Sequence, residues 1–274
     1  MFQEPRYSDV NIVGNRGARL SEVITSAANP LLKEIRRAQD RGTLTDRGWI
    51  VAEGPHLVDE AVRSGLRIRC LVVAEGQEFP AEADRTVILP DSLFRSISST
   101  ESPQGVLALV EPSAFADEAL FRKPELIVVL DGLQDPGNAG TIARAAEAFG
   151  ATGLIWLPGS VNVWNSKTVR ASAGSLFRLP VLRTTDLDCV RILQERCVRL
   201  YAAIPSTRAA LSIHRANLTG AAAIVIGNES RGVSPRLLEA SQPIAVPTQG
   251  VESLNAGVAA SVILFEAARQ RRSI

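Results

Sequence analysis

The sequence predicts a two-domain α/β protein whose C-terminal half is built on a parallel β-sheet. Uninterrupted apolar runs, such as residues 126–130, are typical of strands buried on both faces of a sheet. These runs alternate with segments of helical period, which favours a sheet covered by helices on both faces. A stretch rich in proline and charge, residues 112–124, interrupts the pattern and predicts a linker.

The linker divides the chain into four predicted parts. Residues 1–20 show no clear period and are expected to form an N-terminal arm. Residues 21–111 form a small α/β domain, with helices expected at 28–37 and 56–63. Strands are expected there at residues 49–51, 68–73, 85–89 and 105–110.

Residues 125–274 form the larger domain. Its strands are expected at residues 126–130, 153–157, 200–203, 223–226 and 244–246. Its helices are expected at residues 141–149, 167–177, 187–197, 235–240 and 254–270.

Composition excludes several classes of protein. The three cysteines are scattered and the two histidines lie far apart, so we expect neither a disulfide framework nor a metal site. The polar N-terminus lacks the pattern of a signal peptide, and no apolar run reaches the ~18–20 residues that span a bilayer. A cytoplasmic protein without a membrane segment is therefore expected.

Charge alone does not decide whether the chain binds nucleic acid. The net charge is +1. Arginine supplies all cations except Lys33, Lys123 and Lys167. Arginine suits bidentate phosphate contacts, but a GC-rich genome also encodes arginine often, and both explanations stay open.

The first segment that carries chemistry is residues 130–150. A buried strand ends at Leu130, a glycine-rich loop follows, and a helix then carries Arg144 on its outer side. Polar groups such as Asn138 gather at this carboxyl end of a strand, where open α/β sheets bind ligands. Alternatively, the glycines only shape a tight turn and Arg144 is a surface residue. A dinucleotide-binding loop is disfavoured because the GxGxxG spacing is missing.

Two later segments have a similar layout. In residues 224–238 a buried strand ends at Gly227, and Glu229 follows in a loop before a helix that Ser234 is expected to cap. The alternative for Glu229 is an ion pair with Arg231 or Arg236. In residues 244–272 a short strand leads to Ser253, the expected cap of a long helix rich in small residues.

Together, the three segments resemble the signature motifs of the SpoU family in the SPOUT superfamily of methyltransferases. The residues that carry the resemblance are Asn138, Gly140, Arg144 and Gly150, then Gly227, Asn228, Glu229 and Gly232, and finally Pro247, Gly250, Ser253, Leu254 and Asn255. Residues 167–177 resemble the RAS-type stretch of these proteins. The N-terminal domain is similar to a substrate-binding domain akin to an RNA-binding ribosomal protein.

The resemblance implies a trefoil-knotted catalytic domain, S-adenosylmethionine as cofactor, and a homodimer that completes the site. It implies that the cofactor is bound by Gly227, Val246, Leu254, Asn228, Pro247 and Gly250. It implies that the catalytic set is Arg144, Asn138, Glu229, Ser253 and Asn255. We expect Arg144 to hold a phosphate and stabilise an alkoxide rather than act as a base, because its pKa lies above ~12. We expect Lys33, Arg36, Arg37 and Arg170 to contact RNA.

The function expected from the resemblance is S-adenosylmethionine-dependent 2′-O-methylation of a ribose in structured RNA. The extra N-terminal domain favours ribosomal RNA over transfer RNA as the substrate. A transfer RNA methyltransferase and a non-catalytic RNA-binding or assembly protein on the same fold stay open as alternatives. A nicotinamide-dependent oxidoreductase is disfavoured because no GxGxxG loop is present.

Overall fold

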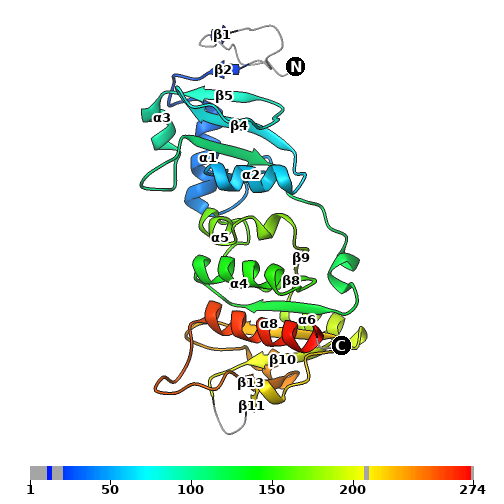
Figure 1. The fold of residues 1–274 in the computed structure, drawn as a ribbon. Coiled ribbons are helices and arrows are strands. Elements are labelled where there is room, and N and C mark those ends of the chain that lie inside the picture. Colours follow the sequence, from blue (N-terminus) through cyan, green and yellow to red (C-terminus); the bar gives the residue numbers. More distant parts are fainter. Residues whose placement is uncertain (1–10, 14–20, 207–209, 273–274) are drawn as a thin grey trace. The chain divides into compact units, whose positions relative to one another are not determined.

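The computed structural model describes residues 11–13, 21–206 and 210–272 (Figure 1). They form two compact units. The first contains the described residues up to Ser113, together with Trp164–Ser166. The second contains the described residues of Ala114–Val163 and Lys167–Ile274. Most of the predicted N-terminal arm lies outside the described residues; the part within them, Asn11–Val13, forms strand β1.

The first unit is a six-stranded mixed sheet with strand order β1-β2-β5-β4-β6-β3. Its strands are β1, β2 (Ser21–Val23), β3 (Ile50–Glu53), β4 (Ile68–Ala74), β5 (Thr86–Leu89) and β6 (Val106–Val110). Its helices are α1 (Pro30–Arg41), α2 (Pro55–Arg63) and α3 (Asp91–Ser96). Asn29 caps α1 by accepting a hydrogen bond from the Leu31 amide, and Gly42 ends it in a left-handed conformation.

A buried carboxylate ties β3 to the segment after α3. Glu53 is 5% exposed and accepts hydrogen bonds from Ser98 Oγ, Ser99 N, Ser99 Oγ and Thr100 Oγ1. Burial raises the pKa of Glu53, but these hydrogen bonds outweigh it and hold the pKa below its ordinary value of 4.5. The ionised form therefore stabilises this unit.

The second unit is built on a seven-stranded, fully parallel sheet with strand order β11-β13-β10-β12-β7-β8-β9. The strands are β7 (Leu126–Asp131), β8 (Gly153–Trp156), β9 (Val181–Arg183), β10 (Arg199–Ala203), β11 (Leu211–Ser212), β12 (Ala222–Gly227) and β13 (Gln242–Ala245). The predicted α/β class and parallel sheet are confirmed.

Helices cover both faces of this sheet, which is why its central strands are apolar throughout. On one face, alternate residues such as Ile127 and Val129 pack against Leu193 of α6 (Asp186–Glu195) and Leu237 of α7 (Pro235–Glu239). The other face is covered by α4 (Pro136–Ala148) and α8 (Ala256–Arg272), which pack against each other. The rings of Phe149, just after α4, and Phe265 of α8 meet edge to face with centroids 5.8 Å apart.

Several helices differ from their predicted bounds; α1, for example, begins two residues later and ends four residues later than expected. Helix α4 begins at Pro136, capped by Asp135, so Gly137 and Gly140 belong to the helix and not to a loop. The segment 167–177 is not one helix: α5 (Ser166–Ala171) and the 3₁₀ turn η2 (Ser175–Phe177) are separated by Ala173 and Gly174, both at positive φ. Helix α8 begins two residues later than expected and continues to Arg272.

The segment 112–124, expected to be a linker, is folded onto the second unit. It forms the 3₁₀ helix η1 (Asp117–Phe121), and its Leu120 is 1% exposed within the core beneath α6. The single buried leucine explains the attachment, because a free linker would leave that side chain in water.

The trefoil knot stays a prediction. Among the described residues, no helix combines the length and the apolar composition needed to cross a bilayer.

Candidate active site

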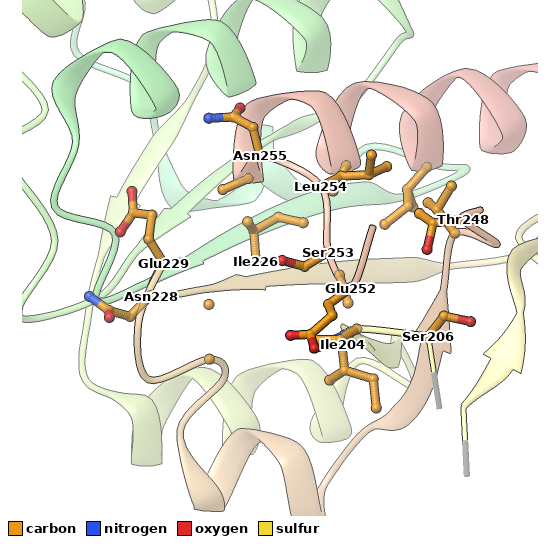
Figure 2. A pocket seen from close by; sticks show the side chains of 18 of the residues that line it. Ile204, Ser206, Ile226, Asn228, Glu229, Thr248, Glu252, Ser253, Leu254 and Asn255 are labelled. Atoms are coloured by element: carbon orange, nitrogen blue, oxygen red, sulfur yellow. The ribbon is translucent and has the colours of Figure 1, made fainter. Parts of the chain in front are cut away.

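A pocket of about 590 Å³ lies at the carboxyl ends of β10, β12 and β13 in the second unit (Figure 2). It is lined by residues of the segments 203–206, 226–232, 244–248 and 252–256, and by Ala259 and Ile263 on α8. Its volume is within the ~300–1,000 Å³ of ordinary ligand pockets. The carboxyl edge of an open parallel sheet is where such folds bind ligands.

A chain of side-chain hydrogen bonds joins the three motif segments beside this pocket. Asn138, in the first turn of α4, donates from Nδ2 to Glu229 Oε1 at 3.1 Å. Its Oδ1 accepts from Asn255 Nδ2 at 2.9 Å. Because the Asn138 amide uses both of its ends, it fixes Glu229 and Asn255 relative to each other.

Glu229 is held in its ionised form. Besides Asn138, the backbone amides of Gln134 and Asp135 donate to its carboxylate at 3.4 and 3.3 Å. Desolvation raises the pKa of Glu229, but the hydrogen bonds from Asn138 and from backbone amides lower it below its ordinary value overall. The structure gives Glu229 these donors in place of the ion pair with Arg231 or Arg236 that the sequence left open.

The loop after β12 is tied down at both ends. Asn228 donates from Nδ2 to the Gly132 carbonyl at 2.7 Å, and its Oδ1 accepts from the Ser230 and Arg231 amides. Backbone hydrogen bonds of 3.0 and 2.9 Å pair Asn228 with Gly232. A Cβ on Gly227 would lie 2.3 Å from the Gly232 carbonyl carbon, so this close approach requires glycine.

Ser234 and Ser253, the two serines expected to cap helices, do not do so through their side chains. Ser234 occupies the N-cap position of α7, but its side chain makes no capping hydrogen bond. Its backbone amide instead donates to the buried Asp131 carboxylate at 2.6 Å. Asn255, not Ser253, caps α8, because its Oδ1 accepts from the Gly257 and Val258 amides. Ser253 lies one turn outside the helix and lines the pocket.

The predicted site residues divide into two groups. The pocket is lined by Gly227, Asn228, Glu229, Val246, Ser253, Leu254 and Asn255. Asn138, Arg144, Pro247 and Gly250 are not among the described residues that line it. Asn138 contacts the lining through its hydrogen bonds. Arg144 is exposed on the outer side of α4 and has no hydrogen-bond or ion-pair partner within the described part of the chain.

The four cations expected to contact RNA differ in their surroundings. Lys33 is exposed on α1. Arg36 donates to Ser96 O, Ser96 Oγ and Ala27 O, which ties α1 to neighbouring segments. Arg37 pairs with Asp46 at 2.7 Å. Arg170 lies in α5 and is half-exposed.

One wall of the pocket was missed by sequence reasoning. Ala203, Ile204, Pro205 and Ser206 follow β10, and no motif marks them. The signal that would have found them is the order of the sheet, in which β10 lies between β12 and β13. Glu252 and Thr248 were also missed, although both lie in the third motif segment; Figure 2 shows both side chains at the pocket.

Metal ligands do not gather in the part of the chain that the structure describes: no three carboxylate, histidine or cysteine residues lie close enough to hold an ion. Cys70 and Cys189 are buried, and burial raises the pKa of each thiol to about 12. The arrangement at the pocket is thus that of a cofactor or substrate site built from amides, one fixed carboxylate and apolar side chains.

Known proteins match both units of this chain. The family model described as SpoU rRNA methylase matches residues 125–265, and the MRM3-like substrate binding domain matches residues 29–108. The 23S rRNA guanosine 2′-O-methyltransferase RlmP of Bacillus subtilis is 29% identical over 88% of this chain and 97% of its own length. The 23S rRNA uridine 2′-O-methyltransferase of Streptomyces viridochromogenes is 32% identical over 85% and 87%.

Solved structures agree. The crystal structure of an RNA 2′-O ribose methyltransferase superposes with a TM-score of 0.78 at 30% identity, over 91% of this chain and 99% of that one. The SpoU methyltransferase AviRb from Streptomyces viridochromogenes, in complex with AdoMet, superposes with a TM-score of 0.76 at 28% identity, over 89% and 99%. The chain belongs to the SpoU rRNA methylase family of S-adenosylmethionine-dependent RNA 2′-O-methyltransferases.

Proposed function

We propose that this chain transfers a methyl group from S-adenosylmethionine to a ribose 2′-hydroxyl of ribosomal RNA in the cytoplasm. The observation that carries the proposal is the hydrogen-bonded chain from Asn255 through Asn138 to Glu229, which draws all three motif segments to the mouth of one pocket. The named relatives that act on 23S ribosomal RNA match 88% and 85% of this chain, which is more than the matched catalytic segment alone.

The pocket suits S-adenosylmethionine. Apolar side chains, among them Ile204, Ile226 and Leu254, offer a surface for an adenine ring. Two carboxylates, Glu229 and Glu252, outnumber Arg231, the one cation in the described lining, and this excess of negative charge complements a cofactor that carries a sulfonium and an ammonium group. The bound cofactor supplies an electrophilic methyl group. The residues of this chain bind it, orient the ribose and assist loss of the hydroxyl proton.

Arg144 is the residue we assign to the RNA side of the reaction. It projects from the exposed side of α4 and carries a charge that no described carboxylate compensates. A guanidinium in that situation is suited to hold a phosphate beside the reacting ribose and to stabilise developing alkoxide charge. Glu229 and Asn255, held by Asn138, orient the ribose or cofactor.

We propose further that the active molecule is a homodimer formed through α8. Val258, Val262 and Phe265 are 48%, 37% and 56% exposed and recur at helical spacing on one side of that helix. Aligned large apolar side chains on a surface mark an interface. Beside them on α4 lie the exposed residues Thr141, Arg144 and Ala148, spaced three and four apart. A second copy docked here would bring Arg144 to the subunit boundary.

The dimer is tested with Phe265→Asp, which replaces the largest and most exposed side chain of the stripe by a charge. Sedimentation should give a monomer for this variant and a dimer for the wild type. The control is Leu187→Asp: Leu187 is 59% exposed on α6, so it matches Phe265 in exposure but lies on the opposite face of the sheet. A wild type that sediments as a monomer would overturn this part of the proposal.

The activity is tested by mapping 2′-O-methylation in ribosomal and transfer RNA from cells with and without the gene. One ribosomal nucleotide should lose its methyl group. In vitro, Arg144→Ala should lower transfer at least a hundredfold, the usual size of an electrostatic contribution of this kind, while S-adenosylmethionine binding measured by calorimetry stays at the wild-type level. Loss of a transfer RNA methyl group instead would reassign the substrate. Absence of cofactor binding would favour a non-catalytic RNA-binding protein.

A further inference from the structure

A second hollow of the catalytic unit lies away from the cofactor pocket and is basic. Its volume is about 570 Å³, and its lining includes Arg122, Lys123, Arg271 and Arg272. These cations come from the segment before β7 and from the C-terminal turn of α8. Pro124 and Thr152, which precede β7 and β8, also line it, so the hollow opens at the amino edge of the sheet.

The positive charge of this hollow is not neutralised locally. The one carboxylate in its lining, Glu147, forms an ion pair with Arg178 at 2.5 Å, and Arg178 lies outside the lining. Arg122 donates only to the Ala119 carbonyl, and neither Lys123 nor Arg272 forms an ion pair within the described residues.

Arg271 differs from the other three cations because it has a structural task. Its guanidinium donates to the carbonyls of Leu218, Pro124, Glu125 and Gly220 at 2.8, 3.1, 2.9 and 2.5 Å. Carbonyl oxygens are neutral acceptors, so they orient the guanidinium without cancelling its charge. The buried Glu125 carboxylate interacts electrostatically with Arg271 but is not in the lining of the hollow.

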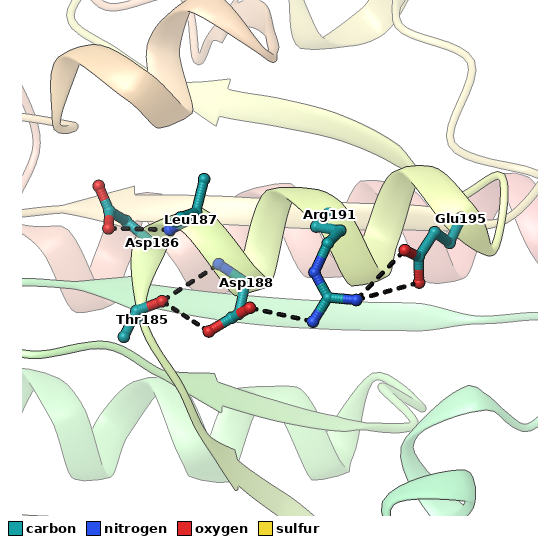
Figure 3. Close-up of polar contacts among 6 residues, drawn as sticks. All are labelled: Thr185, Asp186, Leu187, Asp188, Arg191 and Glu195. Carbon is teal, nitrogen blue, oxygen red and sulfur yellow. Dashed lines mark hydrogen bonds and ion pairs between the residues drawn. The ribbon is translucent and has the colours of Figure 1, made fainter.

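Other exposed arginines of the chain show what a compensated cation looks like. Arg191 on α6 pairs with Asp188 at 3.0 Å and with Glu195 at 3.2 Å (Figure 3). Arg63 on α2 pairs with Glu60 at 3.1 Å. In contrast, Arg122 and Lys123 face a hollow that offers them no such partner.

We propose that this hollow binds the phosphate backbone of the RNA substrate, as a contact separate from the site of methyl transfer. The inference rests on the proposed function, because it takes RNA to be the substrate. The cofactor pocket lies at the carboxyl edge of the same sheet, and β7, six residues long, connects the two edges. At ~3.3 Å per residue this span is about 20 Å. A folded RNA presents phosphates over such a span, whereas a small substrate does not.

The test compares two double variants of the full chain. Arg122→Ala with Lys123→Ala removes two uncompensated cations and leaves Arg271 and its carbonyl contacts in place. The matched control, Arg63→Ala with Arg191→Ala, removes two exposed arginines that are already paired; such surface pairs contribute ~0–1 kcal/mol, so the control folds. Binding of deproteinised 23S ribosomal RNA is measured across a series of salt concentrations.

The double variant in the hollow should bind this RNA at least tenfold more weakly at low salt. The slope of log affinity against log salt should fall by about 1.4 to 1.8, since each lost phosphate contact removes ~0.7 to ~0.9. The control should keep both values, and S-adenosylmethionine binding should be unchanged in both variants.

The proposal is overturned if the hollow variant binds RNA with the affinity and the salt slope of the wild type. A change in oligomeric state without a change in RNA binding would also overturn it, because the hollow would then be a contact between subunits. Methyl transfer by the wild type is measured in parallel. If it is absent while the slope still falls, the proposed function fails and the RNA site stands. If methyl transfer is present and the slope of the hollow variant is unchanged, the proposed function stands and the RNA site in the hollow fails.

Discussion

Replacing Gly227 by alanine tests whether the close approach between β12 and the loop after it builds the cofactor pocket. The new Cβ would lie 2.3 Å from Gly232 C, 2.3 Å from Val233 N and 2.5 Å from Gly232 O. All three atoms are backbone, so no side chain can rotate away. The loop must move, and that movement strains or breaks the paired hydrogen bonds between Asn228 and Gly232.

The expected cost follows from these contacts. Overpacking in a closely packed region costs ~1–3 kcal/mol. Loss of the two backbone hydrogen bonds adds ~0.5–1.5 kcal/mol each. We therefore expect the catalytic unit to lose about 3 kcal/mol of unfolding free energy, which lowers its melting temperature by about 6–12 °C at ~2–4 °C per kcal/mol. The displaced loop lines the pocket, so S-adenosylmethionine affinity should fall at least tenfold.

The control for this substitution is Gly220→Ala in the same unit. No heavy atom lies within 4 Å of a Cβ built at Gly220, and its φ is outside the left-handed range. Its melting temperature, followed by circular dichroism, and its cofactor affinity, measured by calorimetry, should match the wild type. If Gly227→Ala melts together with this control and binds the cofactor as well as the wild type, the geometric reasoning is wrong.

Three further predictions concern stability and reactivity. Arg271→Ala removes a charged donor from four carbonyl groups. Hydrogen bonds to charged groups contribute ~1.5–3 kcal/mol each and do not add fully, so the free energy of unfolding measured by chemical denaturation should fall by about 3 kcal/mol. A loss below ~0.5 kcal/mol would contradict this prediction. The lowered pKa of Glu53 stabilises the first unit above pH 4.5, and this contribution disappears as the pH falls through the pKa of the folded state. On acidification, the first unit should therefore lose stability more steeply in the wild type than in Glu53→Gln. The same dependence of stability on pH in both proteins would contradict this. A maleimide at neutral pH should label only Cys197, the exposed thiol, because Cys70 and Cys189 are buried with pKa values raised to about 12, and mass spectrometry reads the sites.

The five inner strands of the second unit were predictable because a parallel sheet between two helical layers leaves no solvent-facing side, whereas the short edge strands β9 and β11 were not predicted. The run at 223–226 became β12 (Ala222–Gly227), and the run at 126–130 became β7 (Leu126–Asp131). Apolar content alone identifies such strands. It does not give their order, which depends on where the crossovers place each strand.

The start of α4 was not predictable from propensity. Glycine in a helix costs ~1 kcal/mol relative to alanine, so Gly137 and Gly140 suggested a loop. The structure shows why glycine is present inside the helix: a Cβ on Gly140 would lie 2.5 Å from the Thr168 carbonyl oxygen and 2.4 Å from the Ala171 Cβ. Close packing of α4 on α5 overrides the low helix propensity of glycine, and no residue next to Gly140 in the sequence indicates that packing.

The motif residues of the candidate site could be identified from the sequence, but the hydrogen bonds between them and one wall of the pocket could not. Asn138 and Asn255 were both identified, yet they are 117 positions apart, and nothing in either segment indicates that one hydrogen-bonds the other. The wall of the pocket formed by the residues after β10 could not be predicted from the sequence for a related reason. Ala203 and Ile204 belong to the pocket only because β10 lies between β12 and β13.

The position of Arg144 makes the two halves of the proposed reaction separable. All described residues that line the pocket belong to the second unit of one chain, so we expect cofactor binding to need only one chain. Arg144 lies outside that pocket, on the exposed side of α4 next to the apolar stripe of α8. If a second copy covers the apolar stripe, Arg144 becomes part of a complete site of methyl transfer only in the dimer. A monomeric Phe265→Asp protein should then bind S-adenosylmethionine as the wild type does and still fail to methylate RNA. A monomer that transfers methyl groups at the wild-type rate would show that each chain works alone, and Arg144 would have to act on RNA bound to its own subunit.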